Sequence, residues 1–238
     1  MSFEFDNSEI KKSRYQTYSE GKKSFLYNFF KRITIKARGQ FFIYFKESTN
    51  YSNEKSIIDI GTTPSLDSEQ NIFLTKTQEN QNITCFSNQD CKILLKKFNN
   101  IKEIIVGDGK NTLLDENSFD IVHSNATLEH VGNYNNQILF VRELIRISKK
   151  YVFLQTPNRY YPIDFHTILP FIHWLPKKIH RKFLKILKLN FYSKEENLNL
   201  LSKNDLKKIC KELEIIKYKI IEHKLFFLTS NLILIIEK

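Results

Sequence analysis

The sequence predicts an α/β fold, in which a doubly wound, mostly parallel, seven-stranded sheet ends in an antiparallel hairpin and follows a helical N-terminal extension. Short apolar runs alternate with segments of helical periodicity over residues 56–155, a pattern typical of parallel βαβ units. Two further apolar runs, at 215–221 and 232–237, lie together near the end of the chain and predict the hairpin.

The N-terminal region has the pattern of a basic amphipathic helix. Aromatic and aliphatic residues recur at helical spacing over residues 21–46, with lysines and arginines between them and a break expected near Gly39. A polar linker follows at 47–55. We therefore expect a basic helical extension over residues 1–50 and one sheet domain over residues 51–238.

Five short apolar runs predict the parallel strands, and their shortness suits a sheet covered on both faces. A helix is predicted over 134–148, and another begins after Ser202, which forms a capping-box pattern with Asp205. The predicted strands are 56–60, 83–86, 104–106, 119–124 and 151–155.

Residues 156–200 interrupt the alternation and predict a helical lid insertion. Four of the five prolines lie between Pro157 and Pro176, and a second basic amphipathic helix follows at 177–189. We expect the apolar faces of both basic helices to cover the sheet domain, with their lysines in solvent. Docking on an anionic membrane or a lipid-linked acceptor is the alternative.

Composition narrows the class of protein. The net charge of +11 accompanies only two alanines and many Lys, Asn and Ile residues, a bias that an AT-rich genome produces whatever the partner. No RNA-binding module or arginine-rich tract is present, so a nucleic-acid partner is not expected. The three cysteines form no C-x-x-C pair, and no signal peptide or transmembrane run is found, which favours the cytoplasm, with a peripheral membrane location left open.

Polar residues follow four of the predicted strands. In an open parallel sheet, ligands bind at the carboxyl ends of the strands, near the switch in strand order. The strand ends carry Asp59-Ile-Gly61-Thr62, then Gly107-Asp108-Gly109, then Asn125-Ala126 with Glu129-His130, and finally Thr156-Pro-Asn158-Arg159. The sequence therefore predicts one ligand site at this edge of the sheet.

Three of these motifs, in this order and at this spacing, resemble the type 11 group of class I S-adenosylmethionine-dependent methyltransferases. The motifs are Ile-Ile-Asp59-Ile-Gly61-Thr, Val-Gly-Asp108, and Phe-Asp-Ile-Val-His-Ser-Asn125-Ala-Thr-Leu-Glu129-His130-Val. The resemblance covers about residues 55–237. It implies a Rossmann-like fold and methyl transfer from S-adenosylmethionine to an oxygen or nitrogen of a small-molecule, saccharide or lipid-linked acceptor.

The resemblance also implies roles for individual residues. Gly61 would let the backbone approach the cofactor, Asp59 would orient that loop and bind the cofactor ammonium group, and Asp108 would accept from the adenine amine. The methylsulfonium would lie beside Asn125 and Ala126. The implied cofactor-binding residues are Asp59, Gly61, Thr62, Ser87, Asn88, Asp108, Asn125 and Ala126.

Two departures from the family pattern keep alternatives open. The loop Gly61-Thr-Thr-Pro-Ser65 replaces Gly-x-Gly-x-Gly, and Ser87-Asn88 stands where the family has a carboxylate for the ribose. The first alternative is therefore a degenerate methyltransferase-like domain that binds partners without catalysis. The second is an RNA-directed methyltransferase, suggested by the net charge. A dinucleotide-dependent dehydrogenase is poorly supported, because Gly-x-Gly-x-x-Gly is absent.

The acceptor side rests on residues near the lid. His130, His166 and Asp164 are the candidate general bases for a hydroxyl acceptor, with helix capping or packing as the alternative role of His130. Asn158, Arg159 and Asp164 are the candidate substrate-binding residues, and Arg159 would clamp an anionic acceptor. His123, within an apolar strand, is expected to be a satisfied core residue. No metal site is predicted, and the oligomeric state is left open.

Overall fold

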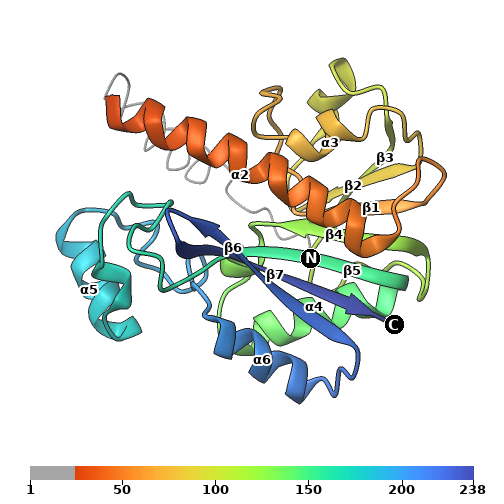
Figure 1. The fold of residues 1–238 in the computed structure, drawn as a ribbon. Helices are drawn as coiled ribbons and strands as arrows, with labels where there is room; N and C mark the ends of the chain where they lie inside the picture. The colour runs from red at the N-terminus through yellow and green to blue at the C-terminus, as the bar shows by residue number, and fades with distance from the viewer. Residues whose placement is uncertain (1–24) are drawn as a thin grey trace, which may run out of the picture.

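The computed structural model describes residues 25–238, which form one seven-stranded sheet with helices on both faces (Figure 1). The strand order is β3-β2-β1-β4-β5-β7-β6, parallel except for β7, which is antiparallel to β5 and to β6. The predicted fold class is thereby confirmed. The strands are β1 (Ile57–Ile60), β2 (Ile83–Ser87), β3 (Ile101–Val106), β4 (Phe119–Asn125), β5 (Ser148–Pro157), β6 (Tyr218–Leu225) and β7 (Leu228–Glu237).

Helices cover both faces of the sheet (Figure 1), and an apolar layer lies between the helices and the sheet on each side. Successive strand residues point to opposite faces, so Ile57 joins the layer with α2 and α3, whereas Ile58 joins the layer with α4 and α6. Both faces of the central strands are therefore largely buried, as their continuous apolar runs predict, whereas the edge strands β3 and β6 are partly exposed. The longer helices are α2 (Phe25–Thr49), α4 (Tyr134–Ile147), α5 (Lys177–Ile186) and α6 (Lys203–Glu212); α3 (Ile72–Lys76) and the 3₁₀ turns η1 (Lys92–Lys96), η2 (Leu128–His130) and η3 (Ile172–Trp174) are short.

The helix α2 is not broken near Gly39 as predicted, and it shares a hydrophobic core with the sheet. It runs through Gly39 without interruption, because glycine keeps its backbone N–H and no other atom crowds this position. Ala37, Phe41 and Phe45 are buried in the same cluster as β1 and β2. The expected covering of the sheet is therefore confirmed for this part of α2, while residues 1–24 and the side chains of 25–32 lie outside the described part.

Two boundaries near the C-terminal end, the start of α6 and the turn between β6 and β7, can be compared with the sequence predictions. Ser202 accepts from the backbone N–H of Asp205, whose carboxylate accepts in return from the N–H of Ser202, so the predicted capping box is present. The hairpin is tighter than the apolar runs suggest. Only Phe226 and Phe227 separate β6 from β7, and both adopt positive φ angles of 48° and 68°, which aligns the strands for a two-residue turn.

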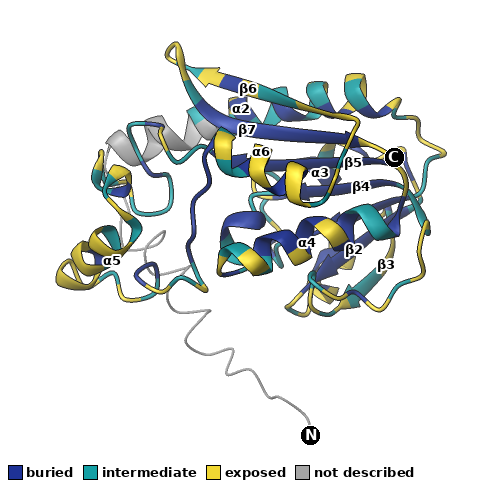
Figure 2. Ribbon diagram, turned by 90° about the horizontal axis from the view of Figure 1, so that it is seen from below, coloured by how far each residue is buried: buried dark blue, intermediate teal, exposed yellow. Residues whose placement is uncertain are grey.

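The lid helix α5 contradicts the expectation that its apolar face covers the sheet. Figures 1 and 2 show α5 standing apart from the sheet, with much of its surface exposed. Its Leu184 is buried in a small separate cluster with Tyr192. Its predicted apolar face is instead exposed by 43–75% at Ile179, Phe183, Ile186 and Leu187. Hydrophobic periodicity identified the helix but not the surface that this face would meet.

The three cysteines are free and buried. Burial raises the pKa of Cys91 and of Cys210 to about 11, so both thiols are protonated at neutral pH. None of the helices between Phe25 and the C-terminus combines the length and apolar character needed to cross a bilayer.

Candidate active site

A cavity of about 510 Å³ opens at the carboxyl ends of the strands, where β1 and β4 are neighbours at the switch in strand order. Its volume is in the range of sites for small molecules and cofactors. The structure brings to this one cavity all of the residues predicted to bind the cofactor and both candidate bases: Asp59, Gly61, Thr62, Ser87, Asn88, Asp108, Asn125, Ala126, His130 and His166.

Asp59 is fixed by partners on two sides. Its Oδ1 lies 2.6 Å from Nδ1 of His123, which is directly opposite in the β1–β4 register, and its Oδ2 accepts from the hydroxyl of Thr62 at 2.8 Å. The His123 ring stacks on Phe73 with 3.9 Å between centroids. His123 is thus the satisfied buried residue that the sequence predicts, and it also orients Asp59, a pairing that only the strand register reveals.

Gly61 is required by backbone conformation and by a neighbour. Its φ angle is +96°, and a β-carbon there would lie 2.0 Å from Oγ1 of Thr127. The side chain that a substitution would strike is therefore Thr127, on the loop after β4, rather than a ligand. The amides of Gly61 and Thr62 both donate to the carbonyl of Phe86, which ties this loop to the end of β2.

The ends of β2 and β3 present the polar groups expected for a nucleoside. Ser87 is buried and Asn88 exposed at the cavity, while Asp90 instead caps the η1 turn by accepting from the N–H of Lys92. Asp90 therefore does not replace the missing ribose carboxylate. Asp108 is 57% exposed and pairs through Oδ1 with the Lys110 ammonium at 2.8 Å, a partner that the motif did not suggest.

The loop after β4 places backbone groups beside the cavity. Ala126 has a φ angle of +52°, which is uncommon for a residue with a side chain, and its N–H donates to the carbonyl of Gln155. Thr127 donates to the carbonyl of Ile60 at 3.3 Å. The β4 loop is thus attached to both neighbouring strands, β1 and β5, which fixes Asn125 at the cavity wall.

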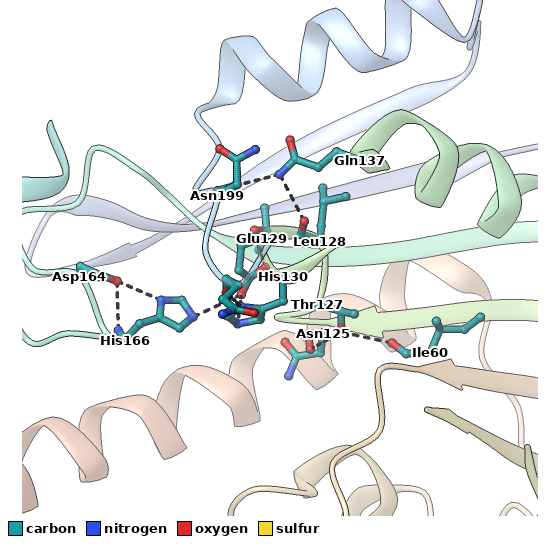
Figure 3. Close-up of polar contacts among 12 residues, drawn as sticks. Ile60, Asn125, Thr127, Leu128, Glu129, His130, Gln137, Asp164, His166 and Asn199 are labelled. Atoms are coloured by element: carbon teal, nitrogen blue, oxygen red, sulfur yellow. Dashed lines mark hydrogen bonds and ion pairs between the residues drawn. The ribbon is translucent and has the colours of Figure 1, made fainter. Parts of the chain in front are cut away.

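Both candidate bases meet at one corner of the cavity (Figure 3). Nε2 of His166 lies 3.7 Å from Oε1 of Glu129, and Nε2 of His130 lies 3.8 Å from the same oxygen. The rings are nearly perpendicular, with 4.9 Å between centroids. Asp164 accepts from Nδ1 of His166 at 2.9 Å and is itself buried, so it holds the histidine rather than facing the cavity. We call Glu129, His130 and His166 the acceptor corner.

Burial and charge act in opposite directions on the ionisable groups here. Burial disfavours the charged form of His166, but the Asp164 and Glu129 carboxylates outweigh it and raise its pKa to about 9. Burial likewise disfavours ionised Glu129, but the nearby imidazoles of His166 and His130 leave its pKa below the usual value. The acceptor corner is therefore an environment that holds a positive charge between carboxylates.

The structure does not bring Asn158 and Arg159 to the cavity. Asn158 donates to the carbonyl of Thr229 at 2.8 Å, which attaches β5 to the hairpin. The Arg159 guanidinium donates to the carbonyls of His173 and Leu175 at 3.2 and 2.9 Å. Arg159 therefore stabilises the lid from within. It does not line the cavity, so it is not placed to clamp an anionic acceptor as expected.

Several residues that line the cavity were not predicted from the sequence. α2 contributes Ala37 and Phe41, and the lid contributes Phe165 and Tyr192. Their periodicity or aromatic character predicts burial, but nothing in the sequence relates them to the strand ends. Phe165 stacks on Tyr161 at 5.3 Å between centroids, and this pair could have been found only from the path of the lid.

Asn199 connects the lid to the β4 loop (Figure 3). Its backbone N–H donates to the carbonyl of Glu129 at 2.7 Å, and its side-chain Nδ2 donates to the carbonyl of Gly132 at 2.9 Å. Its Oδ1 accepts from the Lys177 ammonium at 2.6 Å. A single buried residue therefore joins the first turn of α5 to the segment that carries the acceptor corner.

The cavity residues fit an S-adenosyl cofactor in chemistry as well as in volume. Carboxylates at the ends of β1 and β3 offer acceptors to an ammonium group and to an adenine amine, and Ser87 and Asn88 between them offer groups for ribose hydroxyls. The aromatic rings of Phe86 and Phe140 also line the cavity, as an adenine ring requires.

Comparison with known proteins agrees with this site. A family model described as "Methyltransferase domain" matches residues 77–154, from just after α3 into β5. No curated protein sequence matches the chain.

Three solved structures illustrate the likeness of fold. Magnesium protoporphyrin IX methyltransferase from Synechocystis, with bound SAH, has a TM-score of 0.62 at 12% identity, covering 98% of this chain and 95% of that chain. A SAM-dependent methyltransferase from Aquifex aeolicus has a TM-score of 0.53 at 13% identity, covering 98% of both chains. Phosphoethanolamine N-methyltransferase 2 from Haemonchus contortus, in complex with S-adenosyl-L-methionine, has a TM-score of 0.52 at 12% identity, covering 77% of this chain and 38% of that chain.

At these identities the structural likeness shows the fold alone, and the family match adds the segment that contains Asp108 and the β4 loop. That segment contains Glu129 and His130 of the acceptor corner, but it contains neither His166 nor the β1 loop with Asp59 and Gly61. The chain is therefore similar to the methyltransferase family over residues 77–154, and its fold is the Rossmann-like fold of the S-adenosylmethionine-dependent methyltransferases.

Proposed function

We propose that the protein transfers the methyl group of S-adenosylmethionine to an acceptor oxygen or nitrogen that enters the cavity beside the acceptor corner. The observation that carries this proposal is the single cavity of about 510 Å³, in which the strand-end residues for the cofactor and the histidines for the acceptor lie together. When one cavity holds the methyl donor and the acceptor together, binding has already met much of the entropic cost of bringing them into a reactive geometry.

The residues have separate tasks in this proposal. S-adenosylmethionine supplies an electrophilic methyl carbon on a sulfonium leaving group. Asp59 holds the amino-acid end of the cofactor, in an orientation set by His123 and Thr62, and Asp108 holds the adenine end. The acceptor corner orients the attacking atom and takes up its positive charge or proton, because its carboxylates stabilise an added cation.

The acceptor-facing wall favours a partly apolar acceptor. Ile163, Phe165 and Ile168 line the cavity next to His166, and Ile168 is 46% exposed at its rim. A wholly charged acceptor would lose hydration against these three apolar side chains. Among small-molecule, saccharide and lipid-linked acceptors, we therefore propose an amphipathic one, with a polar reactive group and an apolar portion such as a lipid link.

Calorimetric titration with S-adenosylhomocysteine tests the cofactor site. We expect micromolar binding by the wild type and a tenfold to hundredfold loss, roughly, in Asp108→Ala, the range for a hydrogen bond to a charged group. Asp90→Ala is the matched control, because Asp90 is an exposed carboxylate on a neighbouring loop that does not line the cavity. Absence of wild-type binding at millimolar ligand would leave the degenerate binding domain as the better account.

We also propose that the exposed face of α5 rests on an anionic membrane surface. Ile179, Phe183, Ile186 and Leu187 form its apolar stripe, and the helix and its last turn carry lysines without an acidic residue between 177 and 188. Phe171 and Trp174, 54% and 43% exposed, precede it. An apolar stripe flanked by lysines is complementary to acyl chains below negatively charged headgroups.

Cosedimentation with vesicles tests this surface. We expect the protein to bind phosphatidylcholine vesicles that contain about 30% phosphatidylglycerol or more, because this lipid makes their surface strongly anionic. We expect Phe183→Asp to bind the same vesicles clearly less. Ile216→Asp is the control, because Ile216 is also a highly exposed aliphatic residue but lies outside the lid. Equal binding of the two variants, or no wild-type binding, would contradict the proposal.

A further inference from the structure

The acceptor corner contains three groups that commonly bind metal ions. One ligand atom each from Glu129, His130 and His166 lies within 4.8 Å of the others. Glu129 and His130 come from the β4 loop, whereas His166 comes from the lid (Figure 3). Two imidazoles and one carboxylate are the protein ligands of many catalytic zinc sites and of non-haem iron sites, in which further positions remain open to a ligand.

The carboxylate oxygen at the centre of this group lacks a hydrogen-bond donor. Glu129 is fully buried, and its Oε2 accepts from the Thr156 hydroxyl at 2.9 Å. Among the described residues, Oε1 has no hydrogen-bond partner, since both histidine nitrogens are too distant at 3.7 and 3.8 Å. A buried carboxylate oxygen without a hydrogen bond is costly, and two imidazole nitrogens face it at ion-pair distance, so this position attracts a positive charge, carried by a protonated imidazole or by a metal ion.

Hydrogen bonds at the far sides of the rings orient both histidines toward that oxygen. Nδ1 of His130 lies 2.6 Å from the carbonyl of Asn197, which can only accept, so this nitrogen carries the proton. Nδ1 of His166 likewise lies 2.9 Å from the Asp164 carboxylate. Each Nε2 is thereby directed at Glu129. A carbonyl or carboxylate behind each ring is the usual arrangement around metal-binding histidines.

The distances suit a small divalent ion after minor adjustment. Ligands about 2.0–2.2 Å from a tetrahedral ion lie about 3.4 Å apart. The two Nε2–Oε1 distances of 3.7 and 3.8 Å exceed this value by a few tenths of an ångström, and all three ligand atoms lie within 4.8 Å of one another, so an ion would draw the three side chains closer together. No lysine or arginine whose side chain the structure describes forms an ion pair with Glu129 or Asp164, so none of these residues competes with an ion for the position.

We propose that Glu129, His130 and His166 bind a divalent first-row transition-metal ion of the zinc class, which differs from the expectation of no metal site. This inference rests on the proposed methyl transfer, and it specifies that the acceptor atom is an oxygen. The ion binds the acceptor hydroxyl and lowers its pKa, and the proton leaves to solvent. The oxygen then forms a bond to the methyl carbon as the carbon–sulfur bond breaks, and S-adenosylhomocysteine leaves with the electron pair.

Titration with Zn²⁺ alone tests the site without cofactor or acceptor. After removal of metal with a chelator, we expect the wild type to bind one equivalent with micromolar affinity or better. Glu129→Gln and His166→Gln should each weaken binding by about a hundredfold, and Asp164→Asn, which leaves all three ligands, by about tenfold. Co²⁺ provides a second readout, because its visible absorption reports the coordination in the site.

His180→Gln is the matched control, since His180 is a lid histidine outside the acceptor corner, and we expect it to bind Zn²⁺ as the wild type does. Titration of every variant with S-adenosylhomocysteine verifies folding. Wild-type binding of Zn²⁺ weaker than millimolar, or an equal loss in His180→Gln and His166→Gln, would overturn the metal site. If S-adenosylhomocysteine still binds in that case, methyl transfer stands, and the corner holds a proton instead.

Discussion

Nδ1 of His123, in the middle of the sheet, lies 2.6 Å from Oδ1 of Asp59, and the two residues face each other across β4 and β1. The histidine ring is held between Phe73 and Phe153, at 3.9 and 5.7 Å between centroids. The carboxylate expected to meet the cofactor is therefore fixed from behind by a core side chain.

His123→Phe should separate this hydrogen bond from the ring packing. Phenylalanine keeps the stacked ring but leaves Oδ1 of the buried Asp59 without its donor, so we expect the free energy of unfolding to fall by about 2 kcal/mol and S-adenosylhomocysteine affinity to fall with it. Urea denaturation and calorimetry measure the two effects. His223→Phe is the control, because Nε2 of the buried His223 has no hydrogen-bond partner within the described chain. Equal effects of both changes would argue against an orienting role for His123.

Gly61→Ala should disrupt the cofactor loop. The new β-carbon would lie 2.0 Å from Oγ1 of Thr127 at a φ of +96°, and strain of this kind costs about 1–3 kcal/mol before the clash is added. We expect a lower melting temperature and loss of S-adenosylhomocysteine binding. Adding Thr127→Ala should restore part of the stability, because it removes Oγ1 and Cγ2.

Gly39→Ala is the opposite case and serves as the control for Gly61→Ala. No atom lies within 4 Å of the position where its β-carbon would be, and Gly39 is in the interior of α2. Alanine there should raise stability by roughly 0.5–1 kcal/mol. A melting temperature lowered equally by the two substitutions would contradict the steric argument.

Phe45→Ala should show that α2 belongs to the core of the sheet domain. Phe45 is fully buried and contacts the rings of Phe73, His123 and Phe153, so its truncation should cost about 3–5 kcal/mol. Ile43→Ala, on the exposed side of the same helix at 42% exposure, should cost far less. Urea denaturation of the two variants measures the difference. Similar small losses would mean that α2 is an appendage.

Glu143 should make stability dependent on acid. Burial opposes its ionisation, but bonds from Arg146 and from Thr112 outweigh it and hold its pKa at about 2, below the value of about 4.3 in an unfolded chain. Ionised Glu143 therefore stabilises the fold above about pH 4.5, and this contribution is lost as the pH falls toward 2.

The variant Glu143→Gln measures this contribution. We expect it to be less stable than the wild type at pH 7 by about 2 kcal/mol, a value reduced from the full shift because Arg146 is partly exposed to solvent. The gap should close between pH 4.5 and pH 2 in urea denaturation. Glu196→Gln, at an exposed position, should show no gap at any pH. A gap for Glu143→Gln that is constant with pH would exclude ionisation as its cause.

The strand ends of this fold could be predicted from the sequence because local patterns determine them. A short apolar run fixes the strand, its last residues fall at one edge of the sheet, and Asp59, Asp108 and Asn125 thereby reach one cavity. The meeting of Glu129 with His166 could not be predicted, because the path of the lid between β5 and α6 has no periodicity. The exposed face of α5 was mispredicted for a related reason, since periodicity gives a face but not its neighbour.

The bonds of Asn199 have a consequence for how the enzyme exchanges its product. Because this residue connects the start of α5 to the carbonyls of Glu129 and Gly132, displacing the lid at this end also pulls away the segment that carries Glu129 and His130. Opening the lid at this end therefore also disrupts the arrangement of Glu129 and His130 in the acceptor corner.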